Sequence, residues 1–276
     1  MSANPVPAFA VHVPRPPLSR YIDCLWRAQG IADHKRERVL PNGVVEVIVN
    51  LGSFHKVLAR DDYSREQVYR ESWVAGIQSR HLVIESLRET DLVGIRFRPG
   101  GAYALFGFPM SELADEVVEL HLVRRQSFAD LRERLLQART TAEQFRVVES
   151  MLLGSLDFNR NAHPAVDHLA NRIRSWDGAV RISDLVGQVA LSHKRLMQLF
   201  QRDVGITPKA LAQIYRFQAV LRRIARDSEP DWSRVAVDCG YYDQPHLVHE
   251  FRRLSGLTPS EYVASRLPDF NHTVVG

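Results

Sequence analysis

Cysteine and long apolar runs are scarce in this sequence of 276 residues. Only Cys24 and Cys239 are present, far apart, which argues against a disulfide framework and a four-thiolate zinc site. No apolar run reaches the roughly 18 residues that a membrane-spanning helix needs. The first seven residues, Met-Ser-Ala-Asn-Pro-Val-Pro, have neither the charged nor the apolar region of a signal peptide. We therefore expect a cytoplasmic protein that does not bind a membrane.

Signatures of catalysis are also missing. We find no paired carboxylates, nucleophile elbow, phosphate loop or cluster of metal ligands. His12, His34, His55 and His81 lack metal-ligand spacing and are expected to be mostly surface residues. We expect no catalytic residue, no cofactor and no metal. The alternative is a metal-dependent barrel enzyme with an accessory helical domain, which a metal assay of the purified protein would distinguish.

The excess of positive charge is small and lies at one end of the chain. The net charge is +4. From position 160 onward there are 16 Lys and Arg against 12 Asp and Glu, whereas the residues before it hold 20 of each. A basic stripe can hide in a nearly neutral total, so this is a weak indication of nucleic-acid binding on its own.

A repeat with an offset of 51 residues is the most informative pattern. The segments 196–208 and 247–259 share six of 13 positions, including a phenylalanine, a glycine and a final Thr-Pro pair. A helix, a glycine that ends it and a Thr-Pro restart therefore occur twice. We interpret each copy as part of a helix-turn-helix unit, and two such units in tandem indicate DNA reading.

The change of pattern along the chain predicts two domains. We expect an α+β N-terminal domain over residues 1–158, a small β-barrel-like sheet plus helices, and an all-α C-terminal domain over residues 159–276. The proline-rich residues 1–20 are expected to be extended. Strands are predicted after the turn at Asn42-Gly43 and over residues 92–98, where Val93, Ile95 and Phe97 share one face.

Helices are predicted from residue 128 onward. They cover residues 128–138 and 141–156, the latter with a capping box at Thr141–Gln144. About seven more start near Pro164, Ser183, Ser192, Thr207, Trp232, Asp243 and Thr258.

The predicted reading surface lies on the third and sixth of these seven helices. If Leu196, Leu199 and Phe200 point inward, and Leu247 and Phe251 do so in the second copy, the opposite faces follow from the helical spacing. Gln pairs with adenine in the major groove, and Lys, Arg and His donate to guanine or phosphate. Both helix N-termini also suit a phosphate. The predicted DNA-binding residues are Lys194, Arg195, Met197, Gln198, Gln201, Gln244, Pro245, His246, His249 and Arg252. The helix between the units, from Pro208 to Arg226, would be about 28 Å long.

Positions 163–266 resemble the DNA-binding module of AraC/XylS-type bacterial transcription regulators. The resemblance rests on Leu191-Ser-His-Lys-Arg-Leu-Met-Gln-Leu-Phe200, Gly205-Ile-Thr-Pro-Lys209 and the block from Cys239 to Tyr262. It implies two recognition helices in successive major grooves. Three residues depart from the family pattern: Tyr242 in place of Ser, Pro245 in the first turn, and His249 in place of Arg, which loses a bidentate fork and a permanent charge.

The N-terminal half resembles a domain that accompanies the same module in some bacterial regulators. The matching segments are Leu40–Gly52, Trp73–Gln78 and Val93–Gly107. The resemblance implies a small β-rich sensory or regulatory domain of unknown ligand. We therefore expect a sequence-specific transcription regulator. Its expected partners are double-stranded DNA, a small-molecule effector of the N-terminal domain and a second copy in a homodimer.

Three features of the N-terminal half stay open at this point. The segment Arg96–Gly101 is either an anion site, built from its arginines and a backbone nest, or a strand end with a tight turn. Trp26 and Trp73 line an apolar pocket or pack in the core. The apolar stripe of residues 141–156 is a dimer seam or a cover for the barrel.

Overall fold

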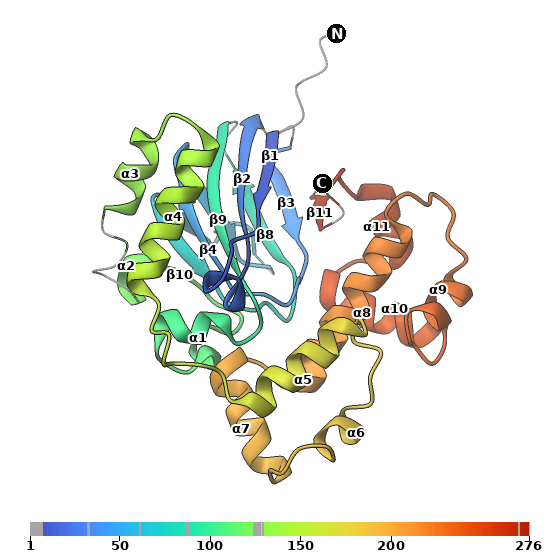
Figure 1. Ribbon diagram of the computed structural model, residues 1–276. Helices are drawn as coiled ribbons and strands as arrows, with labels where there is room; N and C mark the ends of the chain where they lie inside the picture. Colours follow the sequence, from blue (N-terminus) through green and yellow to red (C-terminus); the bar gives the residue numbers. More distant parts are fainter. Residues whose placement is uncertain are drawn as a thin grey trace.

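The computed structural model describes residues 8–31, 34–60, 62–86, 89–123, 128, 130–269 and 271–275. Residues 1–7 of the stretch expected to be extended lie outside these ranges. Two β-sheets form the N-terminal part, and helices form most of the remainder (Figure 1). None of the helices within these ranges has both the length and the apolar character that crossing a bilayer requires.

The first sheet has six strands, all paired antiparallel. Its order is β1 (Ala8–His12), β2 (Ile22–Ile31), β9 (Glu89–Phe97), β4 (Glu46–Asn50), β7 (Ser72–Ala75) and β10 (Val117–Glu119). β9 has the predicted alternation, because Val93, Ile95 and Phe97 are each fully buried. Gly94 lies opposite Trp26, and a Cβ there would be only 1.9 Å from the indole. The glycine thus leaves room for a tryptophan to lie across the strand.

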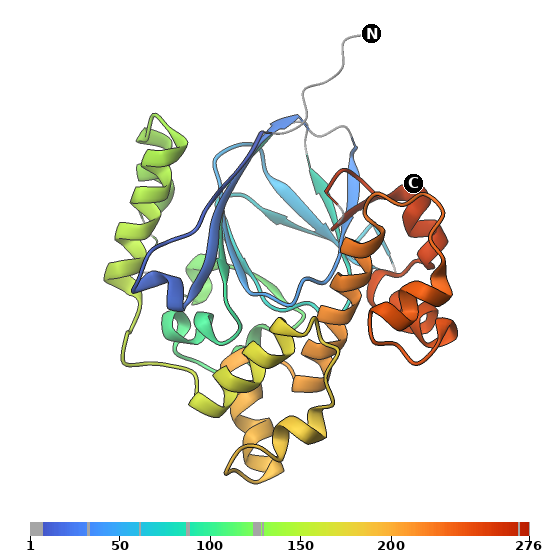
Figure 2. The ribbon, with the colours of Figure 1, turned by 45° about the vertical axis from the view of Figure 1, so that its right-hand side comes forward.

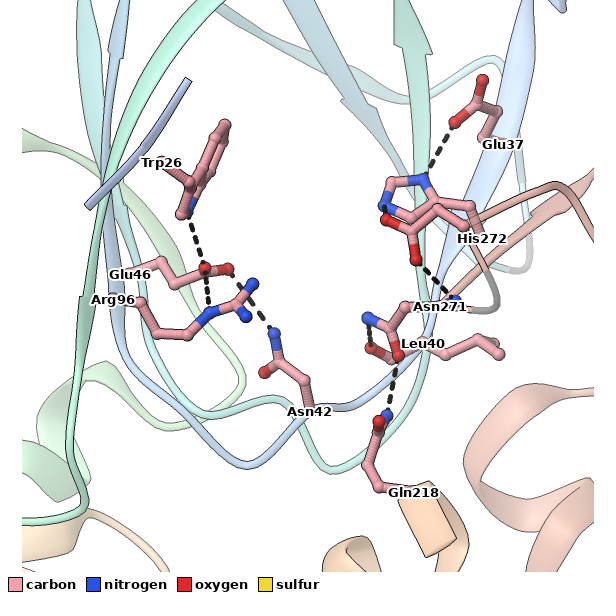
Figure 3. Close-up of polar contacts among 10 residues, drawn as sticks. Trp26, Glu37, Leu40, Asn42, Glu46, Arg96, Gln218, Asn271 and His272 are labelled. Carbon is pink, nitrogen blue, oxygen red and sulfur yellow. Dashed lines mark hydrogen bonds and ion pairs between the residues drawn. The ribbon is translucent and has the colours of Figure 1, made fainter. Parts of the chain in front are cut away.

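The second sheet faces the first without closing into a barrel (Figure 2). Its order is β11 (His272–Val274), β3 (Arg36–Val39), β8 (Leu82–Ser86), β5 (His55–Leu58) and β6 (Glu66–Tyr69). β11 comes from the far end of the chain, so the C-terminal segment is not purely helical. Asn271 directly precedes β11. Its side-chain carboxamide accepts a hydrogen bond from Gln218 and donates one to the carbonyl of Leu40. The end of the chain is therefore tied to both parts of the molecule (Figure 3).

The described residues of the N-terminal part also contain four helices and two 3-10 turns. They are α1 (Gly101–Phe106), α2 (Leu120–Val123), α3 (Leu131–Gln137) and α4 (Thr141–Ser155), with 3-10 turns η1 (Leu18–Arg20) and η2 (Met110–Leu113). The apolar stripe of α4 lies in the main core, so it covers the sheet rather than forming an exposed seam. The predicted cap was wrong by one residue: Thr140, not Thr141, caps α4 by accepting from the Glu143 amide, while the Thr141 hydroxyl accepts from Arg27.

Seven helices follow, as predicted. They are α5 (Pro164–Ser175), α6 (Ile182–Val186), α7 (His193–Val204), α8 (Pro208–Ile224), α9 (Trp232–Asp238), α10 (Gln244–Ser255) and α11 (Pro259–Ser265). Gly205 and Gly256 end α7 and α10 in the left-handed conformation, with φ of 106° and 74°. Thr207 and Thr258 then cap α8 and α11, each followed by a proline at the first helical position. Thr258 and Glu261 form a capping box at the start of α11.

Candidate nucleic-acid interface

The first helix-turn-helix unit exposes most of its predicted reading residues. Leu196, Leu199 and Phe200 are at most 3% exposed and fix the inner face of α7. On the opposite face, Lys194, Arg195, Gln198 and Gln201 are exposed, whereas Met197 is half-buried and packs against the core. The face thus offers two cations and two carboxamides to solvent.

The second unit repeats this construction on α10. Leu247 and Phe251 are fully buried. The exposed residues are Gln244, Pro245, His249 and Arg252, and His246 is half-buried. Pro245 occupies the first turn, where its missing N–H removes no hydrogen bond of the helix.

Two contacts restrain the side chains at the start of α10. The hydroxyl of Ser233, on α9, donates to Oε1 of Gln244 at 3.0 Å. The backbone N–H of Tyr242 donates to Nδ1 of His246 at 3.4 Å, and the imidazole packs edge-on against Tyr241 at 5.2 Å. These bonds engage Oε1 of Gln244 and Nδ1 of His246, whereas the Gln244 amide N–H groups and His246 Nε2 have no hydrogen-bond partner among the residues that the structure describes. This turn therefore presents donors, which match guanine O6 and N7 or phosphate.

The two helix N-termini differ as phosphate sites. Ser192 caps α7 by accepting from the Arg195 amide at 3.3 Å, and Asp243 caps α10 by accepting from the His246 amide at 2.8 Å. A phosphate is attracted by the unpaired amides and the positive end of the helix dipole, but the carboxylate of Asp243 already occupies that position with a negative charge. Only the N-terminus of α7 keeps the predicted character of a phosphate site.

Two buried carboxylates that were not predicted from the sequence hold α7 and α10 in place. Asp203 of α7 is fully buried and accepts from the backbone N–H of His163, at the start of α5, at 2.8 Å. Glu250 of α10 is 2% exposed and accepts from Gln213 at 2.8 Å and Arg216 at 3.2 Å, both on α8. The helical spacing places an acidic residue on the inward face of each helix, and this pattern in the sequence could have indicated the two buried carboxylates.

The N-terminal part of the protein contacts both helix-turn-helix units at the glycine that ends α7 or α10. A Cβ on Gly205 would be 2.9 Å from the carbonyl oxygen of Met110, and one on Gly256 would be 2.5 Å from the ring of His81. The backbone N–H of His81 also donates to the carbonyl of Leu254 at 2.8 Å. The C-terminal ends of α7 and α10 are thus both fixed to the N-terminal part, while their predicted reading faces stay exposed.

Three histidines, one of them (His81) at these contacts, give a prediction for pH. Burial lowers the pKa of His55 to about 4, and burial together with nearby arginines lowers that of His81 to about 4. Both rings are neutral in the folded protein. Their contribution to the free energy of unfolding is therefore lost as the pH falls from about 6.5 toward 4. Burial opposes the charged form of His272, but its hydrogen bond to Glu37 and nearby carboxylates outweigh burial and raise its pKa. That contribution is present below pH 6.5 and is lost as pH rises through the raised pKa.

We therefore expect the free energy of unfolding to be greatest near pH 6.5. Thermal melts from pH 4 to 9 measure this. His81→Gln should weaken the loss on the acidic side, and His272→Gln the loss on the alkaline side. His168→Gln, at an exposed position, is the control and should leave both sides unchanged. A profile of the His272→Gln variant that falls above pH 6.5 as steeply as that of the parent protein would contradict the assignment.

Comparisons with known proteins give two matches to family models, in different parts of the chain. Residues 10–119 match a domain of unknown function (DUF6597), and residues 185–265 match a helix-turn-helix domain. A probable transcriptional regulator, LumQ from Photobacterium leiognathi, is 30% identical over 83 residues, which are 30% of this chain. The match spans about a third (33%) of the length of that relative.

Solved structures of ToxT from Vibrio cholerae are also similar. One covers 93% of this chain and 98% of its own, with 13% identity and a TM-score of 0.46. Another, with unsaturated fatty acid bound, covers 95% and 97%, with 12% identity and a TM-score of 0.43.

Proposed function

We propose that the chain is a transcription regulator of the AraC type and that it reads DNA by placing α7 and α10 in successive major grooves of one duplex. The observation that supports this most is the repeated construction of the two units. Each buries the same leucine and phenylalanine positions, ends at a left-handed glycine and exposes polar side chains on the opposite face. The reading residues proposed are the ten predicted from the sequence, with Met197 and His246 only partly accessible.

The helix between the units supports the spacing. α8 has 17 residues and is therefore about 25 Å long at ~1.5 Å per residue. Equivalent faces of the major groove recur every ~34 Å. Because α7 precedes α8 and α10 packs beside it, the length of α8 plus the width of the units is of the right size for one turn of the duplex. A single chain then does what a helix-turn-helix dimer does.

We propose that the N-terminal domain, residues 1–158, modulates residues 159–276 through the contacts at Gly205 and Gly256. Because both reading helices are held there, a shift of the N-terminal domain would change their relative positions. A small-molecule effector and a homodimer belong to the same proposal. The exposed side chains Phe9, Val11 and Val13, on and just after the edge strand β1, form an apolar surface that supports self-association. A cytoplasmic location follows from DNA as the partner.

Substitutions on the reading faces test the proposal. Gln198→Ala and His249→Ala should each weaken binding to a cognate duplex, obtained by selection from random sequences, by about 5- to 150-fold, the cost of one lost base contact of ~1–3 kcal/mol. Binding to random duplex should change much less. Gln137→Ala, an exposed glutamine on α3, is the matched control. Affinities are measured by fluorescence anisotropy at fixed salt. Equal losses on both duplexes would mean that these side chains contact only phosphate.

A further inference from the structure

Positive charge surrounds the contact between the N-terminal domain and the second helix-turn-helix unit. The backbone N–H of His81 donates to the carbonyl of Leu254, at the end of α10, at 2.8 Å, and the His81 ring meets Gly256. Arg60 donates its Nε to the carbonyl of His81 at 2.5 Å, and Arg80 directly precedes His81 in the chain. Both arginines are exposed. Two cations of the N-terminal domain therefore lie beside the residue that meets the end of α10.

A third arginine of the N-terminal domain, Arg38 on β3, adds to this charge. It is half-buried, and its Nε has no hydrogen-bond partner among the residues the structure describes. Burial is the largest cause of the lowered pKa of His81, and the charges of Arg38, Arg60 and Arg80 lower it further. No carboxylate in the described part of the chain lies within ion-pair distance of these three arginines. The contact with α10 thus gathers three cations that no described side chain neutralises directly.

These cations are continuous with the predicted reading face of α10. Hydrogen bonds from Thr258 are the main cause of the lowered pKa of Glu261, at the start of α11, and the charges of Arg252 and Arg38 lower it further. An arginine of the reading face and one of the N-terminal domain are therefore both close to this carboxylate. The carboxylate itself is held in the capping box, where it accepts from the N–H and the hydroxyl of Thr258 at 2.6 and 2.9 Å. The positive surface thus runs from Arg252 on α10 to Arg80 on the N-terminal domain.

The corresponding contact of the first unit has the opposite charge. Gly205 meets Met110, and the next two residues, Ser111 and Glu112, are exposed. The N-terminal domain therefore presents a carboxylate beside the end of α7 and guanidinium groups beside the end of α10. Duplex DNA carries one negative charge per about 1.7 Å of its axis. Of the two contacts, the one at α10 has the sign that a phosphate backbone requires.

We propose that Arg60 and Arg80 of the N-terminal domain bind the phosphate backbone of the same duplex, beside the major groove that α10 enters. The two side chains are exposed, have no ion-pair partner among the described residues and are continuous with the reading face that brings a DNA strand to them. Guanidinium groups suit phosphate oxygens, because their N–H groups form a planar fork. This inference rests on the proposed function, since it requires α10 to lie in a major groove. It makes the N-terminal domain part of the DNA-binding surface.

The salt dependence of DNA affinity measures these contacts. Each lost phosphate contact lowers the slope of log affinity against log salt by about 0.9, which corresponds to about 8-fold weaker binding at 0.1 M salt. Arg60→Gln and Arg80→Gln should each show this loss, by the same factor on cognate and random duplex, because phosphate contacts carry no sequence information. The double variant should show about twice the change in slope. Fluorescence anisotropy over about 50 to 200 mM salt measures it, and an unchanged slope in the double variant would overturn the proposal.

Two controls separate contact with DNA from folding and from total charge. Arg60→Lys and Arg80→Lys keep the positive charge and should keep most of the parent slope. Arg146→Gln is the matched control, because the exposed Arg146 also donates its Nε to a backbone carbonyl, that of Ala142, at 3.4 Å. Arg146 belongs to α4, which lies on the opposite side of the molecule from α10 (Figures 1 and 2). If Arg146→Gln lowers the slope as much as Arg80→Gln, the loss reflects total charge and the proposal is wrong.

Ethylation interference on the cognate duplex locates the contacts and separates this inference from the proposed function. The double variant of Arg60 and Arg80 should lose phosphate contacts at one end of the site only, next to the base pairs whose recognition His249→Ala relaxes. If Gln198→Ala and His249→Ala weaken cognate binding but the double variant keeps every phosphate contact, the proposed function stands and this inference fails. If the double variant loses phosphate contacts but neither alanine variant changes cognate binding, the N-terminal domain contacts DNA and reading by α7 and α10 fails.

Discussion

Replacing Phe251 with alanine is expected to unfold the second helix-turn-helix unit, at a cost of about 3–5 kcal/mol. The Phe251 side chain is fully buried, and its ring lies edge-on to two others, 4.9 Å from Phe217 of α8 and 5.6 Å from Tyr262 of α11. One ring thus joins α10 to the helices on both sides. Its removal leaves a cavity that these short helices cannot close without losing their mutual packing.

Urea unfolding followed by circular dichroism measures this loss. Val237→Ala is the matched control, because Val237 lies on α9 of the same unit and is 69% exposed. We expect the control to unfold with the parent protein and Phe251→Ala to unfold at clearly lower urea, with weaker DNA binding. Phe200→Ala should do the same in the first unit, since Phe200 is also fully buried. Coincident unfolding curves of Phe251→Ala and the parent protein would show that the core assignment is wrong.

Elements whose signals are local were predictable from the sequence. Each of the seven C-terminal helices has its own cap, proline or glycine signal, and the repeat supplies most of these twice. β4 and β9 were predicted for the same reason, because a β-branched run and a strict alternation need no knowledge of the partner strand. The shift of the α4 cap from Thr141 to Thr140 shows the limit, since neighbouring threonines offer the same hydroxyl to the first turn.

Strands defined by distant partners were not predictable. β11 has three residues, and its place beside β3 depends on a pairing across more than 200 residues of sequence, Thr273 with Arg38. β2 carries charged and small residues with no clear period. Its extended conformation therefore depends on pairing with β9 and was not predictable from its own residues. The two-sheet arrangement is an opened form of the barrel-like sheet expected. The edges of the two sheets depend on which strands pair, and the sequence of a short segment does not determine its partner strand.

The exposed faces of α7 and α10 were predictable for the same local reason, but the contacts that support the two helices were not. Burial of Leu196 and Phe251 fixes which residues point outward, by geometry alone. Whether Ser233 reaches Gln244, or Gly256 touches His81, depends on how separate helices and sheets pack. Asp203 and Glu250, the acids on the inner faces of α7 and α10, were partly predictable. The helical spacing gives their inward position, but it does not give the residues that they bind.

Glu250 gives the second large expected effect. Its side chain is 3% exposed, and its carboxylate lies 3.2 Å from the guanidinium of Arg216. The Arg216 side chain is 17% exposed, and its guanidinium also lies over the ring of Tyr241. Glu250→Leu would leave Arg216 buried without a counter-charge. Breaking a buried pair in this way costs about 3–5 kcal/mol, because the remaining charge keeps its desolvation penalty. Urea unfolding should show a loss of this size, and α10 should lose its position on α8 and hence its affinity for DNA.

A double variant separates the charge from the packing. Glu250→Leu combined with Arg216→Met removes both charges and keeps apolar bulk, so it should recover most of the stability that Glu250→Leu loses. Asp238→Asn is the control for an exposed pair, since Asp238 is 44% exposed and lies 3.9 Å from Arg223, and it should cost less than about 1 kcal/mol. If the double variant is no more stable than Glu250→Leu alone, the anchoring of α10 depends on the Glu250 hydrogen bonds themselves, including the one from Gln213, and not on charge balance.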